Sequence, residues 1–259
     1  MIVYNGKNFN EFGISAIGRG TYGAPARDIE QVHVPGLNGD LLFDSGGFLN
    51  ATVEYPDCCI DSDFPKNFAA LRTFLLSNPG YHRLEDSYAT EEFRMAEFRG
   101  PLSPDVHTGR GNRSGTFTLS FNCKPQRYLK AGEKEIEIQD WATIKNEWMP
   151  SYPIFIVKPG ALGSCWIHFD GEGGSAHVET ITGNTGSLQV EDSTGNANMI
   201  YEVNMLTGVA LRYDEQDPYL KYNAASSVKG GIFTIQPGEH TWRIDSSGPA
   251  WVKPMWWRI

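Results

Sequence analysis

Short runs in which polar and apolar residues alternate recur along most of the chain. The clearest is residues 116–121, where every second side chain is apolar, as in a strand with one buried face. Residues 2–4 form another strand candidate and end at Asn5-Gly6, a strong hairpin signal. Further strands of the first half are predicted at residues 31–34, 50–55 and 81–84.

One segment has the spacing of a helix instead. Its apolar residues recur at intervals of three and four positions, and they are Phe68, Leu71, Phe74 and Leu75. Asp63 precedes the segment as a candidate N-cap, and Pro65 suits the first turn. Residues 78–80, Asn-Pro-Gly, end it. We therefore expect one helix between Asp63 and residue 78.

The second half of the chain is predicted to be β throughout. Its strand candidates are short, spaced by roughly 10–20 residues and separated by Gly, Asn, Asp and Pro, as in a β-sandwich. They are residues 154–157, 166–169, 177–181, 187–190, 209–213, 232–235 and 241–244.

Composition changes near the middle of the chain. Residues 1–130 carry 13 Lys and Arg against 15 Asp and Glu, a net charge of −2, and residues 131–259 carry 9 against 16, a net charge of −7. All seven tryptophans lie in the second of these parts. We expect two domains, residues 1–130 and 146–259, joined by a linker at residues 131–145. The last strand of the first domain should stop at Pro125, which has no N–H for a sheet ladder.

Charge and cysteine content argue against several classes of function. A net charge of −9 disfavours a surface that binds nucleic acid by neutralising phosphates. The longest apolar runs are too short to cross a bilayer, and the N-terminus lacks the basic start and long apolar stretch of a secretory signal. We therefore expect folding in a cytoplasm. The four cysteines, including the adjacent Cys58 and Cys59, form neither a disulfide framework nor a zinc ligand set, and reduced thiols are expected.

No motif in the sequence supports a catalytic or cofactor site. Residues 18–23 match the glycine pattern of dinucleotide sites, but no helical apolar periodicity follows them. Asp57, Asp61 and Asp63 miss the spacing of a calcium loop. The six histidines are scattered, and no nucleophile-turn motif occurs. We therefore expect no enzyme activity, no metal and no cofactor.

Two segments are candidates for contact with a partner. Residues 107–115 are basic and rich in glycine. Arg110 and Arg113 in this loop suit a phosphate or an acidic neighbour, although a solvated hairpin tip is the default interpretation. Trp256 and Trp257 suit a final strand that closes a core or a subunit contact, or a face on which a sugar stacks.

Six segments, in order through nearly the whole chain, carry a resemblance to a known family. The most specific is residues 121–129, Phe-Asn-Cys-Lys-Pro-Gln-Arg-Tyr-Leu. The others are residues 3–7, 12–14, 34–41, 80–86 and 253–259. Together they resemble the distal tail protein (Dit) family of long-tailed, siphovirus-type bacteriophages.

The resemblance implies a fold and a role. The fold is mainly β, with an N-terminal β domain that has one α-helix, followed by a galectin-like C-terminal β-sandwich. The implied role is a ring, usually a hexamer, at the distal end of the virion tail, assembled in the bacterial host cytoplasm. Such a ring joins the tail-tube protein to the tail-associated lysin or tail-tip fibre protein, and it can anchor receptor-binding or baseplate proteins.

Two alternatives stay open. A carbohydrate-binding module would contact the host cell wall through the Trp-rich C-terminal domain. A tail-associated hydrolase would need a pair of carboxylates that the sequence does not single out. For the ring, we expect neither specific nucleic-acid binding nor membrane insertion.

Overall fold

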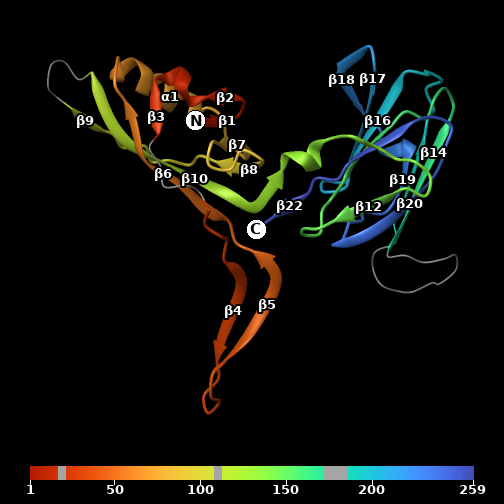
Figure 1. Cartoon of the computed structure of the whole chain (residues 1–259), viewed down its shortest axis with the longest axis horizontal. Coiled ribbons are helices and arrows are strands. Elements are labelled where there is room, and N and C mark those ends of the chain that lie inside the picture. The colour runs from red at the N-terminus through yellow and green to blue at the C-terminus, as the bar shows by residue number, and fades with distance from the viewer. Residues whose placement is uncertain (17–21, 108–112, 172–185) are drawn as a thin grey trace. The chain divides into compact units, whose positions relative to one another are not determined.

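The computed structural model describes residues 1–16, 22–107, 113–171 and 186–259. The chain divides into two compact units, one made of Met1–Arg127 with Ile259 and the other of Tyr128–Arg258. Both units are mainly β, and the described residues contain one α-helix, α1 (Phe64–Leu76), in the first unit (Figure 1). The predicted fold class, mainly β with one helix and a following β-sandwich, is confirmed.

The body of the first unit is a sheet in the order β2-β1-β7-β8-β10-β6-β3, and β9 also pairs with β10. Its elements are β1 (Ile2–Tyr4), β2 (Lys7–Asn8), the 3₁₀ helix η1 (Phe9–Phe12), β3 (Ile14–Ala16), β6 (Ala51–Ile60), β7 (His82–Asp86), β8 (Glu92–Glu97), β9 (Asp105–His107) and β10 (Ser114–Leu129). The predicted hairpin at Asn5-Gly6 joins β1 to β2, and both turn residues have the positive φ (48° and 74°) that this turn requires.

Helix α1 buries its apolar stripe in the core of this unit, as its spacing predicts. The buried helix residues are Phe64, Phe68, Leu71 and Leu75. The N-cap prediction, however, is wrong in its mechanism. Asp63 has a left-handed backbone, and its side chain makes no capping bond. Its carbonyl oxygen accepts the N–H groups of Lys66 and Asn67 at 3.0 Å each, so the backbone alone closes the first turn.

Strand β10 does not stop where the sequence predicts. It continues through Pro125 to Leu129. Its last pair with β6 is Cys123↔Ala51, two residues before Pro125. Because β6 does not extend opposite Pro125, the missing N–H of the proline costs no hydrogen bond to β6, and β10 continues. The proline therefore follows the end of one ladder without ending the strand.

Strands β4 (Arg27–His33) and β5 (Asp40–Phe48) form a separate two-stranded sheet. Neither pairs with any other strand of the described residues. Figure 1 shows this hairpin as a long ribbon that extends away from the sheet of the first unit. We call residues 27–48 the arm. The sequence predicts part of β4 at residues 31–34 and misses β5.

The second unit is a β-sandwich. One sheet has six strands in the order β11-β21-β13-β16-β17-β18, and the other has five in the order β12-β20-β14-β15-β19. Its elements are η2 (Lys130–Glu133), β11 (Ile136–Glu137), β12 (Thr143–Asn146), β13 (Ile154–Val157), β14 (Ser164–Gly171), β15 (Gly186–Glu191), β16 (Met199–Asn204), β17 (Val209–Asp214), β18 (Asp217–Asn223), η3 (Ala225–Ser227), β19 (Val228–Gly230), β20 (Gly238–Ser246), β21 (Ala250–Lys253) and β22 (Trp257–Arg258). The core includes Phe155, Phe169, Tyr201 and Trp242, each at most 2% exposed.

Most strand predictions for the second unit fall inside observed strands. The exceptions are residues 177–181, which lie outside the described residues, and residues 232–235, where the prediction is wrong. That segment is irregular apart from a single bridge between Ile235 and Ser151, and its Phe233 and Ile235 are buried in the core. Residues 131–145, predicted as a linker, contribute η2, β11 and the start of β12.

Candidate functional site

The arm has an unusual number of exposed apolar side chains. They are Ile29 (38%), Leu37 (46%), Leu41 (44%), Leu42 (62%) and Phe43 (57%). Exposed apolar side chains that gather on one element are typical of a site of contact with another molecule.

The register of the arm distributes these side chains over both of its faces. Val32 pairs with Leu41, and Phe43 lies two residues beyond Leu41, so these three share one face. Ile29 and Leu42 lie on the other face. A ribbon of two strands is marginally stable in water by itself. Among the described residues, no other strand pairs with the arm, and apolar side chains on both of its faces are exposed.

Polar contacts across the arm hold its two strands in register. Arg27 Nη1 donates to Asp44 Oδ2 at 2.7 Å, and His33 Nδ1 lies 3.1 Å from Asp40 Oδ1. Exposed pairs of this kind stabilise a fold only slightly. Residues 27–48 contain four Asp and Glu residues against one Arg, so the arm is acidic as well as apolar.

A groove of about 590 Å³ lies at the base of the arm, lined by residues 23–26 and 50–54. The same stretch of β6 has an open edge. On the side away from β10, β6 pairs with β3 only at residues 58–60. Within the described residues, the outer edge of residues 51–55 therefore presents backbone donors and acceptors that another strand can pair with.

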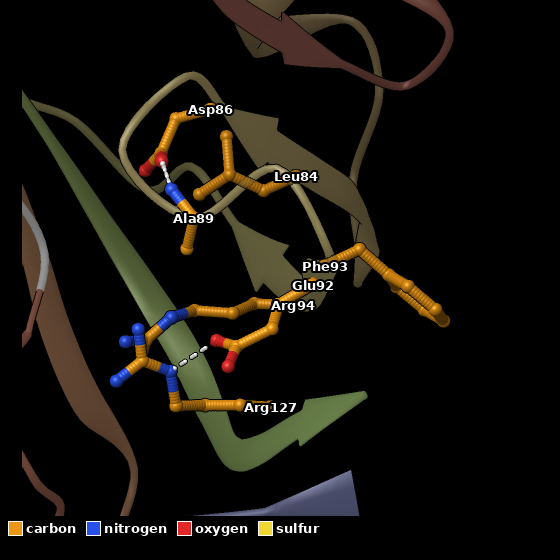
Figure 2. Close-up of a pocket in the computed structure, with 7 residues that line it drawn as sticks. All are labelled: Leu84, Asp86, Ala89, Glu92, Phe93, Arg94 and Arg127. Atoms are coloured by element: carbon orange, nitrogen blue, oxygen red, sulfur yellow. Dashed lines mark hydrogen bonds and ion pairs between the residues drawn. The ribbon is translucent and has the colours of Figure 1, made fainter. Parts of the chain in front are cut away.

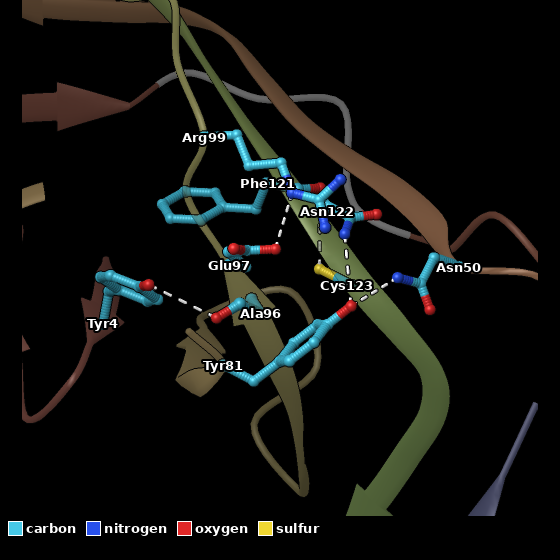
Figure 3. A network of polar contacts seen from close by, with 9 residues as sticks. All are labelled: Tyr4, Asn50, Tyr81, Ala96, Glu97, Arg99, Phe121, Asn122 and Cys123. Atoms are coloured by element: carbon cyan, nitrogen blue, oxygen red, sulfur yellow. Dashed lines mark hydrogen bonds and ion pairs between the residues drawn. The ribbon is translucent and has the colours of Figure 1, made fainter. Parts of the chain in front are cut away.

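Polar side chains fix the point where the arm joins the sheet (Figure 3). Asn50 Nδ2 donates to Tyr81 Oη at 2.6 Å, and Asn122 Nδ2 donates to the same oxygen at 3.3 Å. Lys124 Nζ lies 5.0 Å from the centre of the Tyr81 ring. Beside this network, burial raises the pKa of the Cys123 thiol to about 12. The network links Asn50, which follows β5, to Asn122 on β10. It contains no group with the chemistry of a catalyst, so we interpret it as structural.

A small pocket in the first unit contains a buried ion pair (Figure 2). Arg127 Nε donates to Glu92 Oε2 at 2.7 Å, and the two side chains are 10% and 5% exposed. Asp86 accepts the Tyr55 hydroxyl at 2.8 Å and the Ala89 N–H at 3.2 Å. Burial, reinforced by Asp86, raises the pKa of Tyr55 far above its ordinary value. The cavity volume is about 10 Å³, close to the least that one water needs, so the space beside these charges is too small for a substrate.

The structure places the predicted contact residues as follows. Arg110 lies outside the described residues. Arg113 is exposed, and its carbonyl accepts the first N–H of α1 at 3.3 Å. Trp256 is half-buried against the core of the second unit, and Trp257 donates its Nε1–H to Pro150 O at 2.8 Å. A role of these residues in contacts with another chain stays a prediction.

The arm itself is a candidate that the sequence did not single out. Leu41-Leu42-Phe43 is a continuous apolar run, which is typical of a strand buried on both faces. The available signal was the pair of turn dipeptides, Pro35-Gly36 and Asn38-Gly39, between two strand-like stretches. That signal indicates a hairpin, but it says nothing about the absence of covering layers.

Metal and thiol chemistry find little support. Among the residues that the structure describes, no group of three or more His, Cys, Asp or Glu side chains is arranged to hold a metal ion. No helix in the same part of the chain is long and apolar enough to cross a membrane. All four cysteines are free. Cys59 Sγ donates to Asp61 Oδ1 at 2.9 Å, and this bond together with burial raises the thiol pKa to about 11.

Comparison with solved structures decides the fold. No family model matches the sequence, and no curated protein matches it at a significant level. The crystal structure of SPP1 Dit (gp 19.1), described as a paradigm of the hub adsorption apparatus in phages that infect Gram-positive bacteria, superposes with a TM-score of 0.62 at 13% identity. The match covers 97% of this chain and 96% of that one. The chain has the fold of a phage distal tail protein.

A second solved structure agrees. A chain of the phage p2 baseplate, in its activated conformation with Sr, matches with a TM-score of 0.50 at 10% identity, covering 97% of this chain and 89% of that one. The resemblance seen in the sequence is therefore confirmed at the level of the distal tail protein fold, over nearly the whole length.

Proposed function

We propose that this chain is a structural protein of a phage tail tip or baseplate, and that its first unit assembles into a ring. The observation that carries the proposal is the arm, an unsupported ribbon with apolar side chains on both faces. The shared fold with SPP1 Dit, described as part of a hub, supports the same role. The open edge of β6 beside the groove also supports a ring, because a strand of a neighbouring copy could pair with it.

In such a ring, the arm of each copy contacts the next copy. The contact is heterologous, because the arm meets a different surface of its neighbour, and repeated rotation closes the ring. Full burial of one half-exposed Leu, Ile or Phe side chain contributes about 1 kcal/mol. The five exposed apolar side chains of the arm therefore supply on the order of 5 kcal/mol per contact, before the cost of ordering is subtracted.

The finer parts of the proposal concern partners and place. The ring is a hexamer at the distal end of the virion tail. It joins the tail-tube protein to the tail-associated lysin or tail-tip fibre protein, and it anchors receptor-binding or baseplate proteins. It has no catalytic, metal or cofactor chemistry and binds no specific nucleic acid. The acidic balance of the whole chain supports this last point.

Native mass spectrometry of the full chain at micromolar concentration tests the ring. We expect a closed oligomer for the wild type and a monomer for the double variant Leu42→Asp/Phe43→Asp, which places one charge on each face of the arm. The matched control is Tyr219→Asp/Leu220→Asp, since Tyr219 and Leu220 are exposed neighbours on β18 of the second unit (96% and 53%).

Two results would count against the proposal. A wild-type monomer, both alone and with the tail-tube and tail-tip proteins present, contradicts the ring. An oligomer that persists in the Leu42→Asp/Phe43→Asp variant contradicts the role of the arm. Clearing of host cell wall in a zymogram would favour the hydrolase alternative instead.

A further inference from the structure

We propose that the outer face of the five-stranded sheet in the second unit binds a saccharide. This inference goes beyond the tail-hub role and does not require a ring. The face consists of Trp141, Trp166, His168, Gln189, Arg243 and Asp245, which we call the Trp166 face. Its residues come from β14, β15 and β20, which are adjacent strands of that sheet, and from the segment before β12.

Strand β14 divides its side chains between the core and this face. Cys165, Ile167 and Phe169 are fully buried (0% exposed), whereas the residues between them point outward. Trp166 is 39% exposed. Its ring is stacked with the ring of His168, with centroids 6.2 Å apart and an interplanar angle of 16°. Two nearly parallel rings are therefore neighbours on the outer side of β14.

Planar polar groups flank this pair of rings. Trp166 is paired with Gln189 on β15 and with Asp245 on β20, and His168 is paired with Arg243 on β20. Side chains paired in this way have Cβ atoms roughly 5 Å apart. Gln189 is only 9% exposed, and its Nε2 donates to Glu191, which fixes the orientation of the amide. Hydrogen-bonding groups are thus arranged on both sides of the Trp166 ring.

A second tryptophan lies beside Arg243 on the same face. Trp141 is 59% exposed and lies under the guanidinium of Arg243, whose Cζ is 4.7 Å from the ring centre. Its backbone has a positive φ of 60°, and its N–H donates to Trp242 O at 2.8 Å. A bulky residue in this conformation is an outlier, and such local strain concentrates at binding sites.

The chemistry of the face identifies the class of ligand. Its large non-polar groups are aromatic rings. The other outward side chains of these strands are polar: Thr143, Lys145, Ser187, Glu191, Lys229, Glu239 and Thr241. The centre of a protein–protein interface would be more apolar and depleted in charge.

A pyranose ring fits this arrangement. It presents a C–H face that packs on the flat surface of tryptophan, and its hydroxyl groups exchange hydrogen bonds with amide, carboxylate and guanidinium groups around it. The charges of Arg243 and Asp245 offset each other, so the face suits a neutral saccharide better than a polyanion.

A glycan array probed with the full chain tests the proposal. The array contains hexose and N-acetylhexosamine oligosaccharides and bacterial surface polysaccharides, and the best binder is then titrated by calorimetry. We expect Trp166→Ala to weaken binding about tenfold or more, as for the loss of about 1.4 kcal/mol of contact. Trp141→Ala should weaken it several-fold, and Trp166→Phe, which keeps an aromatic ring, should retain part of the affinity.

The control is Trp148→Ala. Trp148 is exposed to a similar extent (36%) in the same unit and also lies under an arginine, with Arg258 Cζ 5.3 Å from its ring centre, but it is not on the Trp166 face. We expect it to leave saccharide affinity unchanged. Circular dichroism and the unfolding temperature check that each variant is folded.

Several results would overturn the inference. One is the absence of saccharide binding by the folded wild type at millimolar concentration. Another is a bound saccharide whose affinity is the same in Trp166→Ala, Trp141→Ala and the wild type. A third is loss of oligomers in Trp166→Ala without any saccharide binding, which would assign the face to a second copy. Native mass spectrometry of the arm variant reports on the ring separately, so the two proposals fail independently.

Discussion

Asp192, directly after β15, accepts five hydrogen bonds at 2.7–3.0 Å. Three come from the backbone N–H groups of Leu162, Thr194 and Gly195, one from the Thr194 hydroxyl and one from the Tyr201 hydroxyl. The carboxylate thus joins the loop before β14, the loop after β15 and strand β16. We predict that Asp192→Asn strongly destabilises the second unit.

The magnitude follows from the pKa of this carboxyl. Burial by itself would raise the pKa, but hydrogen bonds from Thr194, Leu162 and Tyr201 outweigh it and lower the pKa from 3.8 to about 2. This difference corresponds to about 2 kcal/mol of preference for the charged form. Asparagine keeps the shape but turns one acceptor into a donor that faces N–H groups. We expect the free energy of unfolding to fall by about 2–4 kcal/mol.

The same group produces an acid dependence with a definite sign. Its folded pKa lies below its unfolded pKa, so its contribution is fully present above a pH of about 4 and is lost as the pH falls from about 4 towards about 2. The Asp192→Asn variant lacks this part of the dependence. The difference in unfolding free energy between wild type and variant should therefore shrink in acid.

Tryptophan fluorescence during urea unfolding measures these quantities for the second unit alone, because all seven tryptophans lie in residues 131–259. The control is Asp214→Asn. Within the described residues, its carboxylate accepts the Gln216 N–H at 2.9 Å and the Asn196 side chain at 2.7 Å, in a partly exposed turn, and we expect a clearly smaller loss than for Asp192→Asn. The reasoning is refuted if Asp192→Asn costs no more than this control, or if it keeps the wild-type acid dependence.

Three further predictions concern other contacts. Glu92→Gln leaves Arg127 as a buried charge without its carboxylate, and it should lower the unfolding free energy of the first unit by about 3–5 kcal/mol, as measured by circular dichroism. The double variant Glu92→Gln/Arg127→Met should be more stable than this single variant. The opposite order would contradict the destabilising effect of an unpaired Arg127 charge. Gly132→Ala would place a Cβ 2.3 Å from the backbone nitrogen of Trp256, so the thermal unfolding midpoint of the second unit should fall by several degrees. An unchanged midpoint would show that the segments around Gly132 and Trp256 move apart without cost. The Cys59 thiol has a pKa of about 11, so at pH 7–8 it should react with iodoacetamide about a hundredfold more slowly in the folded chain than a free cysteine does. Mass spectrometry measures the extent of alkylation. Fast alkylation would contradict the hydrogen bond to Asp61.

Local patterns predict well those elements whose burial follows from their own sequence. Residues 154–157 coincide with β13, and the helical spacing of Phe68 and Leu71 predicts α1. In both cases the apolar positions face a core of their own unit. The predicted side-chain cap at Asp63 was wrong even so. Aspartate is favoured before a helix both as a side-chain cap and as a residue with a left-handed backbone, and the sequence does not distinguish the two.

Elements whose environment depends on distant segments are harder to predict. Phe233 and Ile235 alternate like a strand, yet they pack on the core from an irregular segment with one bridge. Leu41–Phe43 has the apolar run of a strand that is covered on both faces, yet all three side chains are exposed. The Trp166 face also depends on distant segments: Gln189 lies beside Trp166 only because β14 pairs with β15, and no local pattern contains that register.

The two proposals concern different units, and this makes their combination testable. If the ring forms, each assembly presents several copies of the Trp166 face, and a polysaccharide with repeated units can occupy more than one of them. Linked sites raise the apparent affinity by about 10²–10⁴-fold when their spacing matches the ligand. The Leu42→Asp/Phe43→Asp variant should then bind a short oligosaccharide as the wild type does but bind the parent polysaccharide far more weakly, measured by calorimetry and by surface-bound polysaccharide. Equal affinity of the ring and the monomer for the polysaccharide would mean that each Trp166 face binds independently. Assembly into a ring would then not strengthen saccharide binding.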